Sequence, residues 1–432
     1  MKIKHLSLRS FRGVKHMELD FTKSVTAFVG VNGVGKSTVL DALAIALSQL
    51  TWRINGHPQK ARPIALDDIL QGDAYARIEL TVELRGSPLT WAITTNRKKG
   101  QHSDPLRTSQ LEALNDAVKK LNAEWEHYES DRQTPYNLPL AVYYDVNRAV
   151  LDIPMRVRTQ LRNIPDEVYQ DALDHGGADF KRFFAWFRQR EDFENEQIRD
   201  KPNFKDRSLE AVRSSIFIFT GFTEMRIRRT PLLRMSVVKN GFEFNVSQLS
   251  DGERNMLALV GDLARRLSVL NPGLENPNHG SGVVIIDEID LHLHPRWQRE
   301  VIQKLEQTFP NCQFVVSTHS PQIIGELNPE SVMLLKDGEL MGSAMRSLGL
   351  SSAEILREIM GTSERNIEFD EAVRQIEQEI EDEQYDSAGA RLFLLEKKYG
   401  QLPEVLRLSE SLIWWTNPQE EGDPESETGD AQ

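Results

Sequence analysis

One segment, Gly30–Thr38, constrains the fold of this chain more than any other feature. It reads Gly-Val-Asn-Gly-Val-Gly-Lys-Ser-Thr and matches G-x-x-x-x-G-K-S, the pattern of loops that cradle phosphate groups. The apolar residues 25–29 precede it and predict a buried strand, and leucines at helical spacing follow it. In a strand, glycine-rich turn and helix, backbone N–H groups and the positive helix end point at one anion. The segment therefore predicts an α/β fold that binds a nucleotide.

Side chains of this loop predict how the phosphates are held. Lys36 is expected to lie on an exposed loop and to reach the outer phosphates, and Ser37 offers a hydroxyl to Mg²⁺. The backbone at Asn32, Gly33 and Gly35 is expected to approach phosphate oxygens closely, since glycine permits the turn. ATP and Mg²⁺ are therefore the expected cofactors.

Composition narrows the possible classes of protein. The 432 residues are 39% hydrophobic, which allows two or three domains with a sizeable core. The net charge of −13 argues against a protein coated in nucleic acid, although a local basic face remains possible. Cys312 is the single cysteine, so no disulfide framework is available. With no apolar signal core at the start and no apolar run near about 18 residues, we expect a soluble cytoplasmic protein.

The first hundred residues predict mainly strands. Apolar residues alternate over residues 1–29, and again over residues 78–84 and 89–93 around a Gly-Ser-Pro turn. Arg12 lies at a tight turn just before the loop. It is either an ordinary surface arginine or a group that contacts nucleotide phosphate.

The middle of the chain leaves several alternatives open. An apolar strand at residues 140–144 ends near Asp145 and Asn147. Polar groups at the carboxyl end of such a strand face the ligand crevice of an α/β sheet, so either residue could sense Mg²⁺ or water, or simply cap a loop. An aromatic-rich helix at residues 180–187 is expected to pack in the core, with base stacking as the alternative.

Two basic runs stand out in this acidic chain. They are the best candidates for a phosphate-contacting face, and solvated arginines are the alternative. The runs consist of Arg156, Arg158 and Arg162, and of Arg226, Arg228, Arg229 and Arg234.

The second half carries further signals of nucleotide chemistry. Residues 248–254, Gln-Leu-Ser-Asp-Gly-Glu-Arg, precede a predicted helix, Asn255–Leu267. Ser250 and Gly252 at the start of a helix are expected to form a second anion site; an ordinary turn and helix cap is the alternative.

Two strands in this half end in polar residues. The apolar run 283–286 leads into Asp287 and Glu288 and is typical of a central parallel strand. Asp287 suits a Mg²⁺-water ligand, and Glu288 suits a base or positioner for the attacking water. The strand at residues 314–316 leads to His319, which is expected at the same edge of the sheet.

His292 and His294 raise the question of a metal site. No further cysteine or histidine lies at ligand spacing, and Pro295 indicates a simple turn. We therefore do not expect a structural metal here.

The C-terminal region predicts a small appended bundle of three helices, followed by an acidic tail, residues 417–432, that we expect to be disordered. Apolar residues expected along these helices are Ile367, Phe369, Val373, Ile376 and Ile380 in the first, Leu392, Leu395 and Tyr399 in the second, and Leu406 and Ile413 in the third.

Together these motifs resemble a known family. Gly30–Thr38, Leu249–Glu253, Val283–Glu288 and His319 stand in the order of the Walker A loop, signature motif, Walker B strand and switch histidine of ABC-type ATPases. Residues 6–13, Leu-Ser-Leu-Arg-Ser-Phe-Arg-Gly, look like the opening of the RecF, SMC and OLD branch and not of membrane transporters.

Within that branch, the chain is most similar to the ATPase subunit of the Septu anti-phage system and to the ATPases of some retrons. The compact size, the stretch Tyr143–Arg148 and the appended helices carry this resemblance. An SMC-like function would need a long coiled coil, and residues 96–240 hold no sustained heptads.

The resemblance implies a nucleotide held between two subunits. Lys36 of one subunit would face Ser250 of the other, with Gly252 and Glu253 in the same signature motif. It also implies that Ser37 and Thr38 join Lys36 in holding phosphates and Mg²⁺.

The resemblance further implies the catalytic roles. Asp287 would support the metal, Glu288 would activate water, and His319 would contact the γ-phosphate. Asp145–Arg148 occupies the place of the family's Q-loop without its glutamine, and Asp251 stands where glycine is commoner in the signature.

The implied architecture is an ABC-type P-loop ATPase head with a mostly parallel central sheet, an antiparallel β subdomain, a helical insertion and a small C-terminal bundle. The expected divisions are 1–95, 96–240, 241–345, 346–416 and 417–432.

The implied function is an ATPase that dimerises around nucleotide and controls a separate HNH-type nuclease acting on foreign DNA. A RecF-like DNA-repair ATPase that binds DNA ends or gaps is the alternative. A transporter ATPase is a third possibility, against which the N-terminal segment argues.

Overall fold

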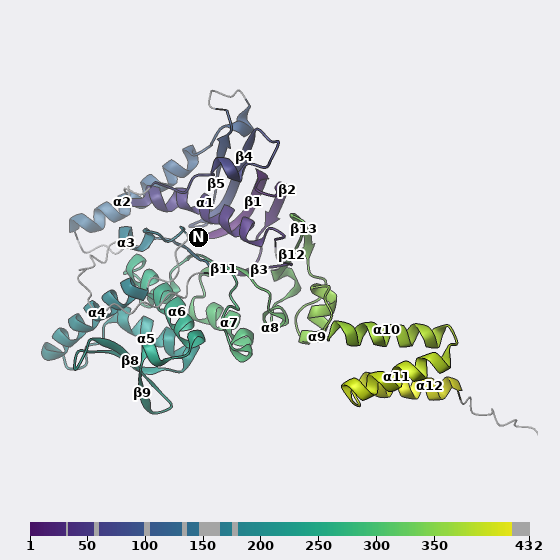
Figure 1. Ribbon diagram of the computed structural model, residues 1–432. Helices are drawn as coiled ribbons and strands as arrows, with labels where there is room; N and C mark the ends of the chain where they lie inside the picture. Colours follow the sequence, from purple (N-terminus) through teal and green to yellow (C-terminus); the bar gives the residue numbers. More distant parts are fainter. Residues whose placement is uncertain are drawn as a thin grey trace, which may run out of the picture. The chain divides into compact units, whose positions relative to one another are not determined.

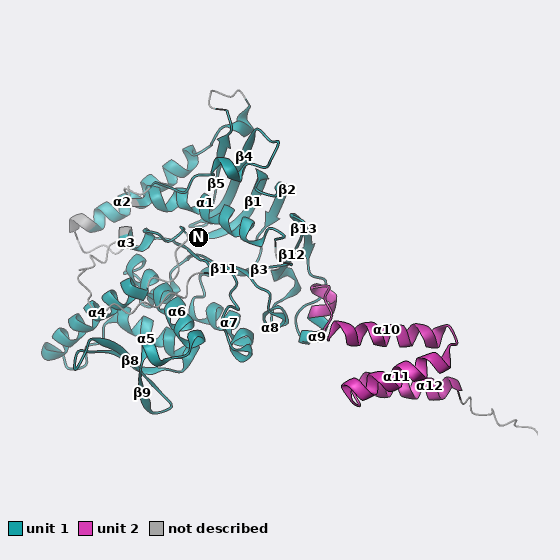
Figure 2. Ribbon diagram, viewed as in Figure 1, with its two compact units in different colours: residues 1–355 teal, residues 356–432 magenta. Residues whose placement is uncertain are grey.

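A computed structural model describes residues 1–31, 33–55, 60–98, 104–131, 136–146, 165–174 and 180–416. The chain forms two compact units, residues 1–355 and 356–432 (Figure 2). The boundary between them lies beyond the expected division at 345/346, and the expected divisions at 95/96 and 240/241 fall within the first unit. Residues of the sequence predictions that lie outside the described ranges are Asn32, Asn147, Arg148, Arg156, Arg158, Arg162 and 417–432.

A six-stranded, mostly parallel sheet forms the centre of the first unit (Figure 1). Its strands, in spatial order, are β13 (Glu339–Ser343), β12 (Val332–Lys336), β3 (Val25–Val29), β11 (Cys312–Ser317), β10 (Gly282–Ile286) and β6 (Leu140–Tyr144). Only the edge strand β13 runs antiparallel to its neighbour. Every residue of β3, β6, β10 and β11 is buried, as expected of parallel strands covered on both faces. The predicted α/β fold class is confirmed.

A four-stranded antiparallel sheet, whose strands β1 and β2 precede β3 and whose strands β4 and β5 follow it, lies against the central sheet. Its order is β2 (Val14–Asp20), β1 (Lys2–Phe11), β4 (Tyr75–Leu84), β5 (Ser87–Asn96). Helix α1 (Lys36–Asn55) packs against β4, and the indole N–H of Trp91 in β5 donates to the carbonyl of Ala46 in α1 at 3.0 Å. Because α1 also contacts β6, β10 and β11 of the central sheet, the helix that follows the phosphate loop is tied to both sheets.

Helices complete the first unit. The remaining ones are α2 (Glu112–Asp131), α3 (Pro165–Tyr169), α4 (Phe180–Asp200), α5 (Arg207–Thr220), α6 (Asp251–Leu270), α7 (Pro295–Thr308), α8 (Pro321–Ile324) and α9 (Ser352–Glu354). The five aromatic residues in the first two turns of α4 are buried, which confirms core packing over base stacking for them; they are Phe180, Phe183, Phe184, Trp186 and Phe187. In the described part of the chain, no helix combines the length and apolar character that crossing a membrane requires.

A small antiparallel sheet carries the second basic run. Its strands are β7 (Thr223–Arg228), β8 (Arg234–Lys239) and β9 (Phe242–Asn245). Arg226 and Arg228 both form ion pairs with Glu243, and Arg229 pairs with Asp192. The run is therefore largely neutralised by carboxylates of the same unit.

The second unit is a three-helix bundle of α10 (Ile367–Glu381), α11 (Tyr385–Tyr399) and α12 (Pro403–Thr416). Its core consists of Phe369, Val373, Ile376, Ala388, Leu392, Leu395, Val405 and Leu408. All the apolar residues expected along these helices lie on them, but three face solvent: Ile367 is 68% exposed, Leu406 46% and Ile413 57%. In α12 the inward face is set by Val405 and Leu408, one residue out of phase with the predicted stripe.

Candidate nucleotide-binding site

The lysine of the phosphate loop is hydrogen-bonded to the backbone of the loop itself. Lys36, the first residue of α1, donates from Nζ to the carbonyl oxygens of Gly30 at 2.7 Å and Val31 at 3.1 Å. Gly33 and Gly35 adopt positive φ angles of 84° and 102°, a backbone region that glycine enters without steric cost. These turns bring the loop back over the start of α1.

Lys36 is buried, with 7% of its surface exposed, and the expectation that it lies on an exposed loop was wrong. Burial lowers the pKa of its ammonium group, while the carboxylates Asp287, Glu288 and Asp290 act in the opposite direction. The lysine therefore lies within electrostatic reach of the residues that follow β10.

Two glycines of the predicted motifs are packed against backbone carbonyls. A Cβ atom on Gly30 would lie 2.4 Å from the carbonyl oxygen of Leu335 in β12. A Cβ atom on Gly252, in the first turn of α6, would lie 2.5 Å from the carbonyl oxygen of His292. Both positions are closed to any larger side chain by backbone atoms.

The carboxylate after β10 faces the serine of the phosphate loop. Ser37 Oγ donates to Asp287 Oδ2 at 3.1 Å. A hydroxyl and a carboxylate oxygen side by side are the oxygen ligands that Mg²⁺ accepts in nucleotide sites, so the residues fit the expected metal. Thr38 follows in the first turn of α1.

Residues at the end of β11 hold the segment after β10. Ser317 Oγ donates to Asp287 and accepts the N–H of Glu288 at 2.7 Å. Thr318 Oγ1 donates to Asp290 Oδ1 at 2.6 Å, and the N–H of His319 donates to the same oxygen at 3.3 Å.

His319 thus lies at the same sheet edge as Asp287, Glu288 and Lys36. Burial and the nearby Lys36 lower the pKa of His319, and the carboxylates Asp290, Glu288 and Asp287 oppose that shift. The imidazole is therefore neutral at neutral pH and able to accept or donate a hydrogen bond.

Sequence reasoning missed Ser317, Thr318 and Asp290 as members of this site. Their signal was their position, since each follows or ends an apolar strand whose neighbours carry the predicted carboxylates and histidine. Asp145, buried at the end of β6, occupies the next strand end, and both interpretations of this residue stay predictions.

The signature segment has a different form from the prediction. Helix α6 begins at Asp251 and not at Asn255, with Ser250 as its N-cap. Ser250 Oγ donates to Glu253 Oε2 at 3.0 Å, and the N–H of Glu253 donates back to Ser250 Oγ at 3.4 Å. This is a capping box, so the hydroxyl predicted to meet phosphate is engaged within its own helix.

Glu253 is held from outside the helix as well. Lys239 Nζ, in β8, donates to Glu253 Oε1 at 2.5 Å. Burial disfavours the carboxylate, but the bonds from Lys239 and Ser250 prevail and lower the pKa of Glu253. The small β7–β9 sheet therefore anchors the signature segment.

Arg12 has two carboxylate partners. Its guanidinium donates to Asp41 in α1 at 2.6 Å and to Asp68 at 2.9 Å. Burial opposes the charged form, but these two bonds raise the pKa of Arg12. Asp41 also accepts from Arg62 at 3.0 Å, so the arginine is part of a network that braces α1.

One of the two histidines after β10 caps a helix. His294 is the N-cap of α7 and accepts the N–H of Arg296 at 3.3 Å. Across the described residues, no group of three or more His, Cys, Asp or Glu side chains is placed to hold a metal ion.

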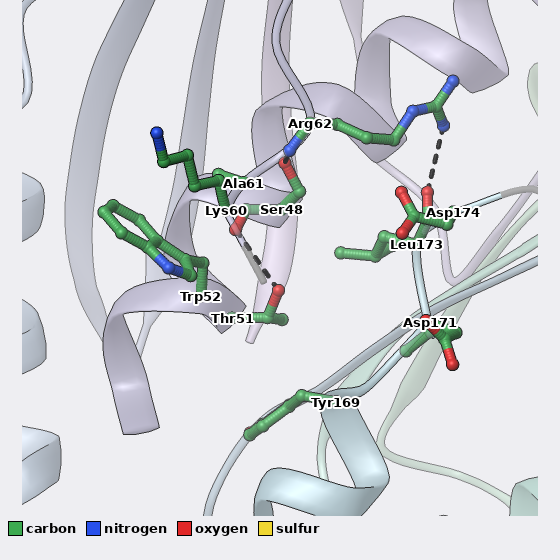
Figure 3. A pocket seen from close by; sticks show the side chains of 11 residues that line it. Ser48, Thr51, Trp52, Lys60, Ala61, Arg62, Tyr169, Asp171, Leu173 and Asp174 are labelled. Atoms are coloured by element: carbon green, nitrogen blue, oxygen red, sulfur yellow. Dashed lines mark hydrogen bonds between the residues drawn. The ribbon is translucent and has the colours of Figure 1, made fainter. Parts of the chain in front are cut away.

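A separate small pocket lies against the C-terminal half of α1 (Figure 3). Ser48 there donates to the carbonyl of Ile45 at 2.7 Å and accepts the N–H of Arg62 at 2.9 Å. Arg62 also donates to the carbonyl of Leu173 at 3.0 Å. The pocket contains none of the phosphate-loop or strand-end residues, and its polar groups brace α1.

Comparison with known proteins decides the family. Residues 25–325 match the profile of the family described as "AAA domain, putative AbiEii toxin, Type IV TA system". The chain belongs to this AAA-domain family. The matched range includes the phosphate loop, the signature segment, both strand ends and His319.

Named relatives include probable ATPases of retrons and a Septu protein. The chain is 31% identical to "Retron Vc95 probable ATPase" of Vibrio cholerae over 86% of this chain and 81% of that protein. It is 29% identical to "Retron Ec83 probable ATPase" of Escherichia coli over 90% of this chain and 82% of that protein. It is 22% identical to "Septu protein PtuA" of Bacillus thuringiensis over 88% of this chain and 90% of that protein. The predicted resemblance to retron and Septu ATPases is confirmed, and the chain is an ATPase.

Proposed function

We propose that this ATPase hydrolyses Mg-ATP at a site shared between two copies of the chain and thereby controls a partner nuclease in defence against foreign DNA. One observation carries the hydrolytic part of this proposal: Lys36, Ser37, Asp287, Glu288 and His319 meet at one edge of the central sheet. Their neighbourhood is supported by the Ser37–Asp287 bond and by the electrostatic influence of the carboxylates on Lys36 and His319.

In this proposal Lys36 exchanges its bonds to Gly30 and Val31 for bonds to phosphate oxygens. Ser37 and Asp287 are the residues that would hold Mg²⁺, which neutralises phosphate charge when bound. Glu288 accepts the proton of the attacking water. His319, neutral at its lowered pKa, hydrogen-bonds the γ-phosphate.

The shared site assigns Ser250 a task in the partner subunit. A serine at a helix N-terminus can donate to phosphate, and the helix dipole favours the anion. Because Ser250 Oγ is bonded to Glu253, donation to phosphate requires the hydroxyl to rotate away from that carboxylate. Lys239 would then keep Glu253 in place and paired.

The second unit is proposed as the docking surface for the nuclease, which we expect to be of the HNH type. It supports this role with large apolar side chains that its own small core leaves in solvent; they are Ile367, Phe393, Leu394, Leu402, Leu406, Ile413, Trp414 and Trp415. Exposed apolar side chains gathered on one small unit are typical of an interaction surface. The retron and Septu relatives support the proposed role in defence. We also propose that the protein acts in the cytoplasm.

The shared site is tested with the Glu288→Gln variant and light scattering. Bound but unhydrolysed ATP should hold two copies together, since a ligand favours the form that binds it. We expect a dimer, or a multiple of dimers, with Mg-ATP and a smaller species without it. Adding Ser250→Arg should loosen this dependence, while Ser247→Arg, three residues upstream, serves as the matched control. An ATP-bound monomer would refute the shared site.

The proposal also includes binding of DNA by the arginines of the second basic run. Phosphates would have to compete with Glu243 and Asp192 for Arg226, Arg228 and Arg229. We expect binding that weakens steeply with salt, measured by gel shift with the partner present. Absence of binding at low salt would remove DNA from the proposal; preferential binding to ends or gaps without any nuclease partner would instead favour the RecF-like alternative.

A further inference from the structure

Ser317 lies between two strands at the centre of the nucleotide site. It is the last residue of β11, it is 0% exposed, and β11 pairs in parallel with β10. Its hydroxyl donates to Asp287 Oδ1 and accepts the N–H of Glu288 at 2.7 Å. One side chain thus contacts both residues that follow β10.

The donated bond fixes the orientation of the Asp287 carboxylate. A serine hydroxyl has a single proton, and here that proton is directed to Oδ1. The other oxygen, Oδ2, accepts from Ser37 at 3.1 Å. Asp287 is therefore anchored through one oxygen and presents the other to the phosphate-loop serine.

The accepted bond fixes the backbone of Glu288. Glu288 has a φ angle of 46°, an uncommon value for a residue with a side chain. Its N–H is directed at Ser317 Oγ, and the next N–H, of Ile289, donates to the Ser317 carbonyl at 3.0 Å. The turn that aims the Glu288 side chain is thus held from β11 at two successive residues.

We propose that Ser317 is a positioning residue of the ATPase reaction. Its hydroxyl presents one oxygen of Asp287 to the metal position beside Ser37 and fixes the backbone from which Glu288 reaches the attacking water. This inference rests on the proposed roles of Asp287 and Glu288. Residues that orient a metal ligand from behind commonly contribute about tenfold or more to metal affinity or activity.

The test compares Ser317→Ala and Ser317→Cys with the same changes at Ser215. Ser215, in α5, is also 0% exposed, donates to the carbonyl of Ala211 at 2.7 Å and accepts from Asn278 at 2.8 Å. It therefore reproduces the loss of one donated and one accepted buried bond away from the nucleotide site. Cysteine keeps the volume of the side chain but donates weakly, so this variant reports on the bond if the alanine variant fails to fold.

Three measurements separate positioning from stability. They are the affinity for Mn²⁺ in the presence of ATP, followed by electron paramagnetic resonance, the affinity for a fluorescent ATP analogue in EDTA, and kcat with saturating Mg-ATP. For the Ser317 variants we expect Mn²⁺ affinity and kcat about tenfold lower, with analogue affinity in EDTA unchanged. The Ser215 variants should change the thermal midpoint alone.

Mn²⁺ affinity and kcat at Ser317 that match the Ser215 variants would overturn the inference and leave the ATPase proposal standing. Failure of the unmodified protein to bind Mn²⁺ with ATP would overturn the proposed metal site itself. The unmodified protein therefore distinguishes the two failures.

Discussion

The nucleotide site and the C-terminal bundle differ in how far their side chains have partners within the chain. At the nucleotide site, Lys36, Ser37, Asp287 and Ser317 are bonded to one another or to nearby backbone. In the bundle, apolar side chains as large as Trp414, 67% exposed, lie in solvent. The polar side chains of the first region are hydrogen-bonded within the chain, whereas the second exposes apolar side chains that its own core does not cover. This difference is consistent with the proposal that the first region is the ATPase site and the second a docking surface.

The largest expected effect is the loss of ATP turnover on substitution of Glu288, which tests whether the nucleotide site is the site of hydrolysis. Glutamine keeps the shape and the hydrogen-bonding capacity but cannot take a proton from water. Glu288→Gln should lower ATP turnover by a factor of about 10² or more while ATP binding survives. Phosphate release under saturating Mg-ATP measures it, with Glu300→Gln in α7 as control. Turnover at the level of the unmodified protein would exclude Glu288 as the base.

Lys36→Ala should have the next largest effect. A hydrogen bond to a charged group is worth roughly 1.5–3 kcal/mol, so ATP affinity should fall roughly ten- to hundredfold. Because Lys36 is buried and bonded to two carbonyls, its loss also leaves acceptors without a partner and should lower the thermal midpoint.

Lys304→Ala is the matched control for Lys36→Ala. Lys304 donates to the carbonyl of Phe219 and pairs with Glu300 away from the site. We expect it to leave ATP affinity unchanged. Equal affinity losses in the two variants, by titration calorimetry, would contradict a phosphate-binding role for Lys36.

A smaller effect is expected in the pH dependence of stability, and two histidines should show it with opposite sign. Burial lowers the pKa of His319, so its contribution to stability is complete above the unfolded value of about 6.5 and is lost as the pH falls. The pKa of His5 is raised: burial opposes the charge, but Asp20 and Glu18 prevail. Its contribution is complete below about 6.5 and is lost as the pH rises.

Thermal unfolding of His319→Gln and His5→Gln, followed between about pH 5 and 8, measures this difference. The stability gap between the unmodified protein and His319→Gln should narrow toward acid. The gap to His5→Gln should narrow toward base. Parallel pH profiles for the two variants would show that the surroundings of the two histidines do not shift their pKa values in opposite directions.

The smallest effect on ATP turnover is expected in the bundle. Leu406 is 46% exposed, whereas Leu408 in the same helix is 1% exposed. Leu406→Ser should leave turnover and folding unchanged but remove co-purification of the nuclease. Leu408→Ser should disrupt the bundle by placing a hydroxyl in its core.

Removal of residues 356–432 should likewise spare ATP binding and lose the partner. Retention of the nuclease by Leu406→Ser and by the truncated protein would place the docking surface elsewhere.

The sequence predicted the strand ends well because their pattern is local. Asp287 and His319 each follow an apolar run, and parallel strands bring their carboxyl ends to one edge. The burial of Lys36 was not predictable in this way, since it depends on loop carbonyls and on strands far along the chain. The Ser250–Glu253 capping box was visible as S-x-x-E, but its anchor Lys239 lies on a separate sheet.

In the bundle, the sequence pattern did not determine which apolar residues are buried. Ile367, Leu406 and Ile413 fit an apolar stripe at helical spacing, yet they face solvent because Val405 and Leu408 take the inward positions of α12. Spacing indicates which residues share a face, but it does not indicate which of two apolar faces is covered. That choice depends on the volume the neighbouring helices leave.

The contacts of Gly30 and Gly252 give these two positions an additional constraint. Both belong to motifs that we propose bind phosphate, yet each is closed to a larger side chain by a carbonyl oxygen, of Leu335 and of His292. A saturation library selected only for correct folding, with no nucleotide present, should therefore already be depleted of every substitution at these two positions. Such depletion would result from the close approach of neighbouring backbone atoms and would not be evidence of ATP binding.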